Sequence, residues 1–227
     1  MTKDMNFERI ILIGCGEHAR MIIDNIEEID NISVLGLISD KQDDVGKEVY
    51  GYPIIGTDDD VDRIFRQNDD LTGYFLAVGM LLNGNMCVRN RIAKRLDKKY
   101  RAVNIIHPLA IVSKHAQIGY GNLFEAYTKV ANGAIVGNHC IINSFSAMNH
   151  DLIIGNNVLI AGNVSMAGKK IGDNTIIADG ASIGFKKSVG RDCIIGDGTV
   201  VVKDVPDGCI MIGNPARLLR KNEYAEK

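Results

Sequence analysis

The sequence predicts a mixed chain, with a small α/β domain in residues 1–104 followed by a parallel β-helix and a short tail in residues 105–227. Two observations carry this prediction. Strand-like apolar runs alternate with amphipathic stretches up to about residue 104. From Ile106 to Val201 every sixth residue is apolar, with one residue dropped between Met166 and Ile171. Because a strand has a period of two and a helix 3.6, a sustained period of six predicts stacked coils of three hexads each.

The first part has the element order of a Rossmann-like domain. Strands are expected at 9–13, 33–38 and 74–78, and helices up to about residue 29, over 58–67 and over 85–99. Tyr50–Pro53 is expected to be a turn-rich connection. At the other end of the chain, Gly213–Arg217 and the basic residues after it are expected to form a helical tail.

Composition limits the class of protein. The 227 residues carry a net charge of −2, which gives no basic field for nucleic acid, and the chain has neither a long apolar run nor a signal-peptide pattern. The five cysteines include no C-x-x-C pair. This favours a reducing cytoplasm, with no membrane segment, no disulfide framework and no thiolate zinc site.

A glycine loop follows the first expected strand. Gly14-x-Gly16-x-x-Ala19 fits the phosphate loops in which backbone N–H groups at a helix N-terminus hold phosphate, with Asp40 placed as a ribose partner. The alternative is a tight turn without a ligand. About 100 residues leave no room for a second mononucleotide half, so a nucleotide attached to the substrate is favoured over NAD.

Hexads three apart should lie one above another, about 4.8 Å apart. Counting through the dropped residue puts His150 on one column with Lys169, Lys186 and Lys203, which would suit a long polyanion such as coenzyme A. The alternative is a solvated face.

Asp151 distinguishes His150 from the competing histidines, because a carboxylate can orient or charge-stabilise an imidazole. Those competitors are His18, His107 (expected to be structural), His115 and His139, whose face a trimer could bring against a neighbour's His150. No close histidine pair suggests a metal site.

Several motifs resemble the bacterial sugar acetyltransferases of the left-handed β-helix superfamily, in particular the group of sialic acid O-acetyltransferases and bacillosamine-type nucleotide-sugar N-acetyltransferases. They are the glycine-rich α/β start, His107–Ser113, Asn149-His150-Asp151, Val201–Pro206 and Gly213–Ala216. The resemblance covers essentially the whole chain. It implies left-handed coils, a homotrimer, and acetyl-CoA bound in the groove between neighbouring coils.

The resemblance also implies site residues. His150 would be the general base and Asp151 would raise its basicity. The nucleotide sugar would contact Gly14, Gly16, Glu17, His18, Ser39, Asp40 and Gly79. We expect acetyl-CoA to contact Gly168, Lys169, Ala178, Asp179, Gly180, Lys186, Gly196, Asp197 and Lys203. Two departures stand out: Leu159 replaces a second histidine of some members, and the segment Met80–Met86 is longer than usual.

The expected reaction is acetyl-CoA-dependent N-acetylation of the 4-amino group of a UDP- or GDP-linked 4-amino-4,6-dideoxy sugar, by direct transfer. O-acetylation of a sialic acid or a related sugar is an alternative, because the same base serves a hydroxyl group. A third possibility is a trimeric nucleotide-binding scaffold without catalysis.

Overall fold

The structure, a computed structural model, describes residues 7–79 and 87–225. Two compact units divide the chain: one holds the residues up to 79 together with 92–105, and the other holds 87–91 with 106–225. The beginning of the third helix therefore groups with the coil, whereas a division at residue 104 leaves that helix whole. None of the described helices is long and apolar enough to span a membrane.

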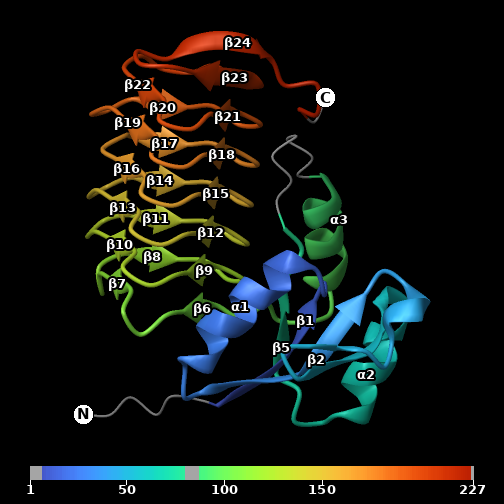
Figure 1. Ribbon diagram of the computed structural model, residues 1–227. Helices are drawn as coiled ribbons and strands as arrows, with labels where there is room; N and C mark the ends of the chain where they lie inside the picture. The colour runs from blue at the N-terminus through green and yellow to red at the C-terminus, as the bar shows by residue number, and fades with distance from the viewer. Residues whose placement is uncertain (1–6, 80–86, 226–227) are drawn as a thin grey trace. The chain divides into compact units, whose positions relative to one another are not determined.

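The first unit is built on a five-stranded sheet with the order β3-β4-β2-β1-β5 (Figure 1). All neighbours are parallel except β3 and β4, which form a hairpin. The strands are β1 (Glu8–Ile13), β2 (Ile32–Ser39), β3 (Glu48–Val49), β4 (Tyr52–Thr57) and β5 (Gly73–Leu76). The connection expected at Tyr50–Pro53 is thus only partly a turn. Tyr50 and Gly51 both take positive φ and close the hairpin, and β4 begins directly afterwards.

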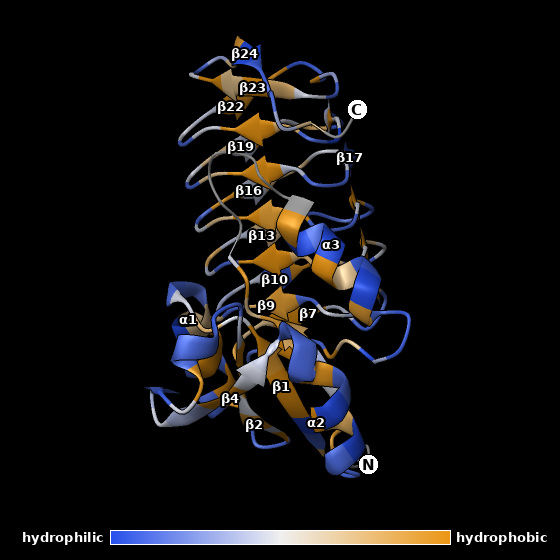
Figure 2. Ribbon diagram, turned by 90° about the vertical axis from the view of Figure 1, so that its right-hand side faces the viewer, coloured by the Kyte–Doolittle hydropathy of each residue, from blue (hydrophilic) through white to orange (hydrophobic). Residues whose placement is uncertain are grey.

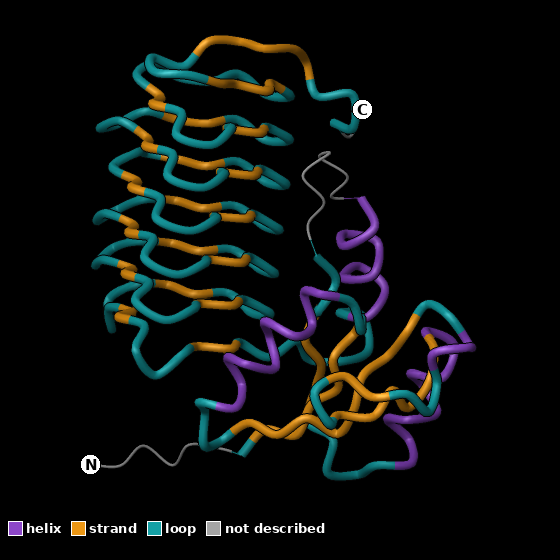
Figure 3. The backbone as a smooth tube through the Cα atoms, viewed as in Figure 1, coloured by secondary structure: helices purple, strands orange, loops and turns teal. Residues whose placement is uncertain are grey.

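Two helices, two short 3₁₀ turns and the later part of a third helix complete this unit (Figure 3). They are α1 (Glu17–Glu27), η1 (Gln42–Asp44), η2 (Asp58–Asp60), α2 (Val61–Gln67) and, from Ile92 on, α3 (Cys87–Leu96). The apolar face of α1 is buried. Val61 and Ile64 of α2 pack with Ile11 and Ile13 of β1. Strand β1 is therefore paired on both edges, with β2 and β5, and packed against α2, which fixes the start of the loop at its carboxyl end.

The second unit is a left-handed β-helix of two-residue strands stacked in three parallel sheets (Figure 1). Every one of the seventeen hexad residues is the second residue of a strand, so the period of six and the dropped residue are both confirmed. The first sheet contains β7 (Ile111–Val112), β10 (Lys129–Val130), β13 (Ala147–Met148), β16 (Ser165–Met166), β19 (Ser182–Ile183) and β22 (Val200–Val201). The second contains β8 (Gln117–Ile118), β11 (Ile135–Val136), β14 (Ile153–Ile154), β17 (Lys170–Ile171) and β20 (Ser188–Val189).

The third sheet runs the full height of the coil. It contains β6 (Ile105–Ile106), β9 (Leu123–Phe124), β12 (Ile141–Ile142), β15 (Leu159–Ile160), β18 (Ile176–Ile177), β21 (Ile194–Ile195), β23 (Cys209–Ile212) and β24 (Arg217–Lys221). The expectation of a helical tail is wrong, because β24 pairs antiparallel with β23. An open strand edge offers unpaired N–H and C=O groups, and the tail satisfies them.

Inward-pointing side chains fill the coil with one continuous apolar core, and the strands stand out as apolar in Figure 2. Two residues after each strand the backbone turns a corner. At most of these corners the third residue after the inward one takes a positive φ, as at Tyr127, Phe145, Asp151 and Lys186. Corner side chains are therefore aimed outward in vertical columns, which is how residues 18 positions apart come to act together.

Candidate active site

The glycine loop lies where the sequence predicts it, between β1 and α1. Gly14 has φ +114°, and a Cβ there would lie 2.8 Å from the Ala77 carbonyl oxygen, so no larger residue fits between β1 and the end of β5. Gly16 precedes the first residue of α1, and no side chain caps this end of the helix. No side chain therefore competes with an anion for this end of the helix.

The other predicted substrate residues come together at the same edge of the sheet. Ile13 is level with Ile38 of β2 and Leu76 of β5, so the three strands end side by side. A Cβ on Gly79 would lie 3.4 Å from the Cβ of His18, which places these two residues in contact range. Ligands of open α/β sheets bind at such carboxyl ends, next to the point where the strand order reverses.

The end of β2 contains a polar group that sequence reasoning found only in part. Ser39 is buried and donates its hydroxyl to Asp44 at 3.0 Å, while Asp40 is exposed. Lys47 donates to the other oxygen of Asp44 at 2.8 Å. Hydrogen bonds from Lys47 and Ser39 hold the pKa of Asp44 below its ordinary value. Asp44 and Lys47 were missed because their loop has no motif; they form an ion pair whose ammonium group interacts electrostatically with Cys15 of the glycine loop.

His150 and Asp151 form the pair on which the catalytic prediction depends. His150 Nδ1 lies 2.8 Å from Asp151 Oδ2, on the corner after β13, and both side chains are mostly exposed. Neighbouring strand residues point apart, but Asp151 has φ +60°, and this turns its carboxylate back toward the imidazole. In a neutral imidazole whose Nδ1–H donates a hydrogen bond to the carboxylate, Nε2 carries the lone pair and can accept a proton.

Gly133 supports this pair from the coil below. The Asp151 backbone N–H donates to the Asn132 carbonyl at 3.1 Å, and a Cβ on Gly133 would lie only 2.1 Å from Asp151 Oδ1. The carboxylate thus occupies the space that the missing side chain leaves. The repeat contains many glycines, and only the stacking of coils distinguishes this one.

The column of lysines is confirmed by strand register. Met148 of β13 pairs with Met166, Met166 with Ile183, and Ile183 with Val201. The corners after these strands present Lys169, Lys186 and Lys203, all exposed. Lys186 has a left-handed backbone conformation, with φ +57°. Lys169 does not, because the dropped residue shortens the corner at Gly168.

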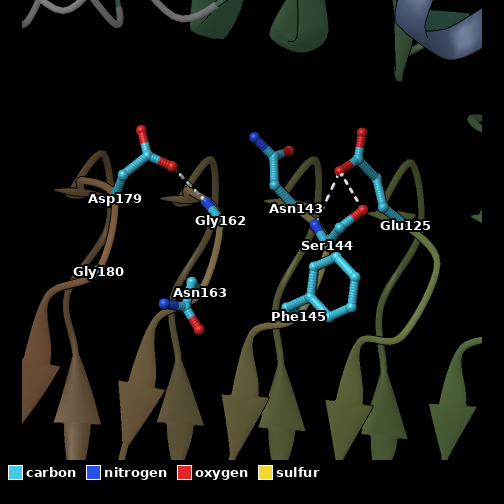
Figure 4. A pocket seen from close by; sticks show the side chains of 8 residues that line it. All are labelled: Glu125, Asn143, Ser144, Phe145, Gly162, Asn163, Asp179 and Gly180. Atoms are coloured by element: carbon cyan, nitrogen blue, oxygen red, sulfur yellow. Dashed lines mark hydrogen bonds between the residues drawn. The ribbon is translucent and has the colours of Figure 1, made fainter.

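The other residues that are predicted to contact acetyl-CoA lie at a different corner of the coil. Ala178, Asp179 and Gly180 follow β18, and Gly196 and Asp197 follow β21, both in the third sheet. The expected acetyl-CoA contacts are therefore divided between two corners of the coil. Asp179 and Gly180 line a hollow of about 570 Å³, together with Glu125, Asn143, Phe145 and their neighbours (Figure 4).

The competing histidines have other surroundings. His107 Nδ1 accepts the Leu109 backbone N–H at 3.0 Å, which agrees with the expected structural role. His139 is buried: its carbonyl accepts a hydrogen bond from Arg89 at 3.3 Å, and its ring meets the edge of Tyr120. A neighbouring chain therefore does not meet an outward-facing His139, contrary to the expectation. His115 is exposed on the first coil.

Within residues 7–79 and 87–225, no cluster of three or more His, Cys, Asp or Glu side chains is placed to hold a metal ion. The structure places Leu159 in β15, where it packs against the small cluster of Ile176, Ile194 and Ile210. The segment Met80–Met86 lies outside the described residues.

Comparisons with known proteins support the same architecture. Residues 9–96 match the PglD N-terminal domain family. A histidine-to-asparagine variant of perosamine N-acetyltransferase from Caulobacter crescentus, solved with CoA and GDP-perosamine, is similar with TM-score 0.83 and 27% identity, covering 93% of this chain and 97% of that one. The acetyltransferase domain of PglB from Neisseria gonorrhoeae, solved with acetyl coenzyme A, has TM-score 0.81 and 26% identity, covering 94% and 100%. A search of curated protein sequences finds no significant match.

The fold, the histidine–aspartate corner and these similarities define the class: the chain is an acetyltransferase of the left-handed β-helix, hexapeptide-repeat class. Its place within that class follows from residues 9–96. These residues match the PglD N-terminal domain family, and the chain as a whole is similar to nucleotide-sugar acetyltransferases.

Proposed function

We propose that this enzyme transfers the acetyl group of acetyl-CoA to the 4-amino group of a UDP- or GDP-linked 4-amino-4,6-dideoxy sugar. The single observation that carries the proposal is the 2.8 Å contact of His150 Nδ1 with Asp151 Oδ2 on an exposed corner, in a chain that also has a PglD-type domain. The similarity to an N-acetyltransferase solved with GDP-perosamine favours an amine acceptor over a hydroxyl group.

Acetyl-CoA is the co-substrate, and the lysine column fits its charge. Lys169, Lys186 and Lys203 present three cations on successive coils, about 4.8 Å apart in height, which matches a chain of phosphates lying along the coil. In the first unit, the uncapped start of α1 and Lys47 would hold the diphosphate of the nucleotide sugar.

In the proposed reaction the sugar's amine nitrogen attacks the thioester carbonyl carbon directly. His150 Nε2 accepts the proton that the amine loses, and Asp151 stabilises the resulting imidazolium. The carbon–sulfur bond breaks and the CoA sulfur leaves with the electron pair. General base catalysis of this kind contributes about 10²–10⁴ in rate.

The two sets of expected acetyl-CoA contacts lie at different corners, so a single chain does not present both to one ligand. A homotrimer, in which one coil's lysine corner faces the neighbour's third sheet, supplies both. We therefore include the trimer in the proposal, with the cytoplasm as its compartment, since the four described cysteines are free.

The test is thiol release and thermal shift with acetyl-CoA and a panel of UDP- and GDP-linked amino sugars, with sialic acid included for O-acetylation. We expect CoA release that depends on an amino sugar, and a loss of about 10²-fold or more in kcat for His150→Ala with the oligomer intact. Wild-type turnover in His150→Ala would refute the assignment of His150 as the general base. No CoA release with any sugar would favour a scaffold.

A further inference from the structure

The third corner of the coil, which follows the strands of the third sheet, changes between its N-terminal and its C-terminal coils. The third residue after each inward one has a positive φ, and in successive coils these residues are Tyr127, Phe145, Asn163, Gly180 and Gly198. A Cβ on either glycine would meet no atom of the described residues within 4 Å, its own chain neighbours apart. Packing within the chain therefore does not require these glycines, and the absent side chains leave a clear path along the upper coils.

Arg217 lies at the top of the same corner. It is the first residue of β24 and is paired with Ile212 of β23. Ile212 in turn lies over Gly196, since a Cβ on that glycine would come within 3.1 Å of Ile212 Cγ2. The corner residues that are expected to contact acetyl-CoA, which follow β18 and β21, therefore continue upward into the start of β24 (Figure 1).

The guanidinium group of Arg217 is held at one nitrogen and open at the other two. Its Nη1 donates to the Ala216 carbonyl at 3.0 Å and to the Pro215 carbonyl at 3.5 Å. Nε and Nη2 make no hydrogen bond, and the group makes no ion pair, within residues 7–79 and 87–225. These two nitrogens form the edge of the guanidinium that binds two oxygens of one phosphate at once.

The other two cations of β24 already have partners. Arg220 Nη1 lies 3.6 Å from Glu223 Oε1. Lys221 Nζ lies 3.4 Å from Cys209 Sγ and 3.5 Å from the Asp207 carbonyl oxygen. Arg220 is also three residues further along the strand, about 10 Å from the start of β24. Among the cations of this strand, Arg217 is therefore the one that can serve a ligand at the third corner.

The length of acetyl-CoA places a phosphate at this height. About thirteen bonds separate the thioester sulfur from the first phosphorus, and an extended chain advances about 1.2 Å per bond, which gives about 15 Å. Lys203 lies three coils above His150, at about 14 Å, so it is level with the diphosphate. In the third sheet β24 lies four strands above β15 of the histidine's coil, at about 19 Å. The phosphate that lies beyond the diphosphate is the 3′-phosphate of the ribose.

We propose that Arg217 binds the 3′-phosphate of acetyl-CoA and so selects CoA over its 3′-dephospho form. The inference rests on the proposed function, in which acetyl-CoA lies along the coil with its thioester at His150. A three-fold axis parallel to the coil keeps the heights equal in all chains of the trimer, so the length argument holds when His150 belongs to a neighbouring chain. The open edge of the guanidinium meets two oxygens of the phosphate, and the glycines below it leave room for the ligand.

The test compares acetyl-CoA with acetyl-3′-dephospho-CoA, which differ only in the phosphate group assigned to Arg217. Steady-state kinetics give a KM for each thioester and for the amino sugar, and isothermal titration gives the affinities for CoA and 3′-dephospho-CoA without any sugar. Arg217→Ala removes the guanidinium, and Arg217→Lys keeps the charge without the two-nitrogen edge. The matched control is Arg220→Ala, which removes an exposed arginine from the same strand.

We expect the wild-type enzyme to prefer acetyl-CoA by about tenfold or more in KM, because the dephospho form loses a charge-assisted, bidentate contact. In Arg217→Ala the KM for acetyl-CoA should rise by this factor, while the KM for the dephospho form changes less than about twofold. Arg217→Lys should retain part of the preference. The kcat, the sugar KM and the melting temperature should stay at wild-type values in every variant, because backbone groups pair β24 with β23. Arg220→Ala should keep the full preference.

Three results would overturn the inference: a wild-type enzyme that does not distinguish the two thioesters, an Arg217→Ala variant that keeps the wild-type ratio of their KM values, or an equal loss of preference in Arg220→Ala. Its failure differs from that of the proposed function. A wild-type protein that acetylates the sugar, while Arg217→Ala still prefers CoA, refutes the 3′-phosphate site alone. A protein that prefers CoA in titration, and loses this preference in Arg217→Ala, but acetylates no amino sugar refutes the reaction alone.

Discussion

Gly133 allows the catalytic pair to be perturbed without replacing either of its members. This glycine lies one coil below Asp151 and has φ +70°. An added Cβ would lie 2.1 Å from Asp151 Oδ1. In Gly133→Ala the carboxylate must therefore rotate away, and its contact with His150 Nδ1 is lost.

The cost to stability is small. A residue other than glycine in the left-handed region loses about 1–2 kcal/mol, and replacing glycine recovers about 0.4–1 kcal/mol through the unfolded chain. The clash itself is relieved by rotation of an exposed side chain. A net loss of about 1 kcal/mol lowers the melting temperature of a chain of this size by about 2–4 °C.

Gly133→Ala should affect the catalytic rate more strongly than it affects stability. A hydrogen bond to a charged group contributes about 1.5–3 kcal/mol, and the lower end applies here because the pair is mostly exposed in the single chain. Since 1.36 kcal/mol corresponds to a factor of ten in rate, we expect kcat to fall about tenfold in Gly133→Ala with both KM values unchanged.

The assay is thiol release under saturating substrates, with melting temperature measured on the same preparations. Gly208→Ala is the matched control: its φ is +65°, and a Cβ there would meet only Ala225, at 3.5 Å. It should lose similar stability and keep wild-type kcat. Wild-type turnover in Gly133→Ala would refute the role of Asp151, and an equal loss of kcat in Gly208→Ala would assign the effect to the coil as a whole.

Two further predictions concern titratable groups. Burial raises the pKa of the Cys140 thiol to about 12 and that of Cys193 to about 11, so alkylation at mildly alkaline pH should modify Cys15 in the glycine loop and spare these two. Peptide mass spectrometry checks this, and rapid labelling of Cys140 in the native protein would contradict it. Hydrogen bonds from Lys99 and Tyr100 lower the pKa of Asp62 below its ordinary 3.8. The charged carboxylate therefore stabilises the folded state at pH values above 3.8, and this stabilisation is lost as the pH falls through the lowered pKa. Asp62→Asn should lower the unfolding temperature near neutral pH and converge with wild type in acid; a constant difference would argue against the ion pair.

The sequence alone determines the features that repeat along the chain. The inward residue of every hexad, the dropped residue before Ile171 and the column that contains His150 follow from counting, because a coil of fixed length places every eighteenth residue in register. The strand–glycine loop–helix at Gly14 follows equally, since it depends on neighbouring residues only. Strand β4, which begins at Tyr52, and the pairing of the tail with β23 were not predicted, because each is stabilised by a partner strand rather than by its own pattern.

Only the tertiary structure decides which corner residues meet. Asp151 turns back to His150 because its backbone is left-handed and because Gly133, 18 residues earlier, leaves space for its carboxylate. The ring of Phe145 stacks on Tyr127 across the same interval, and the residues that line the hollow come from successive coils of the third sheet. These contacts depend on side-chain direction and on the missing Cβ of a single glycine, quantities that a hydrophobic period does not contain. The period therefore determines the scaffold, and the packing of one coil on the next determines the site.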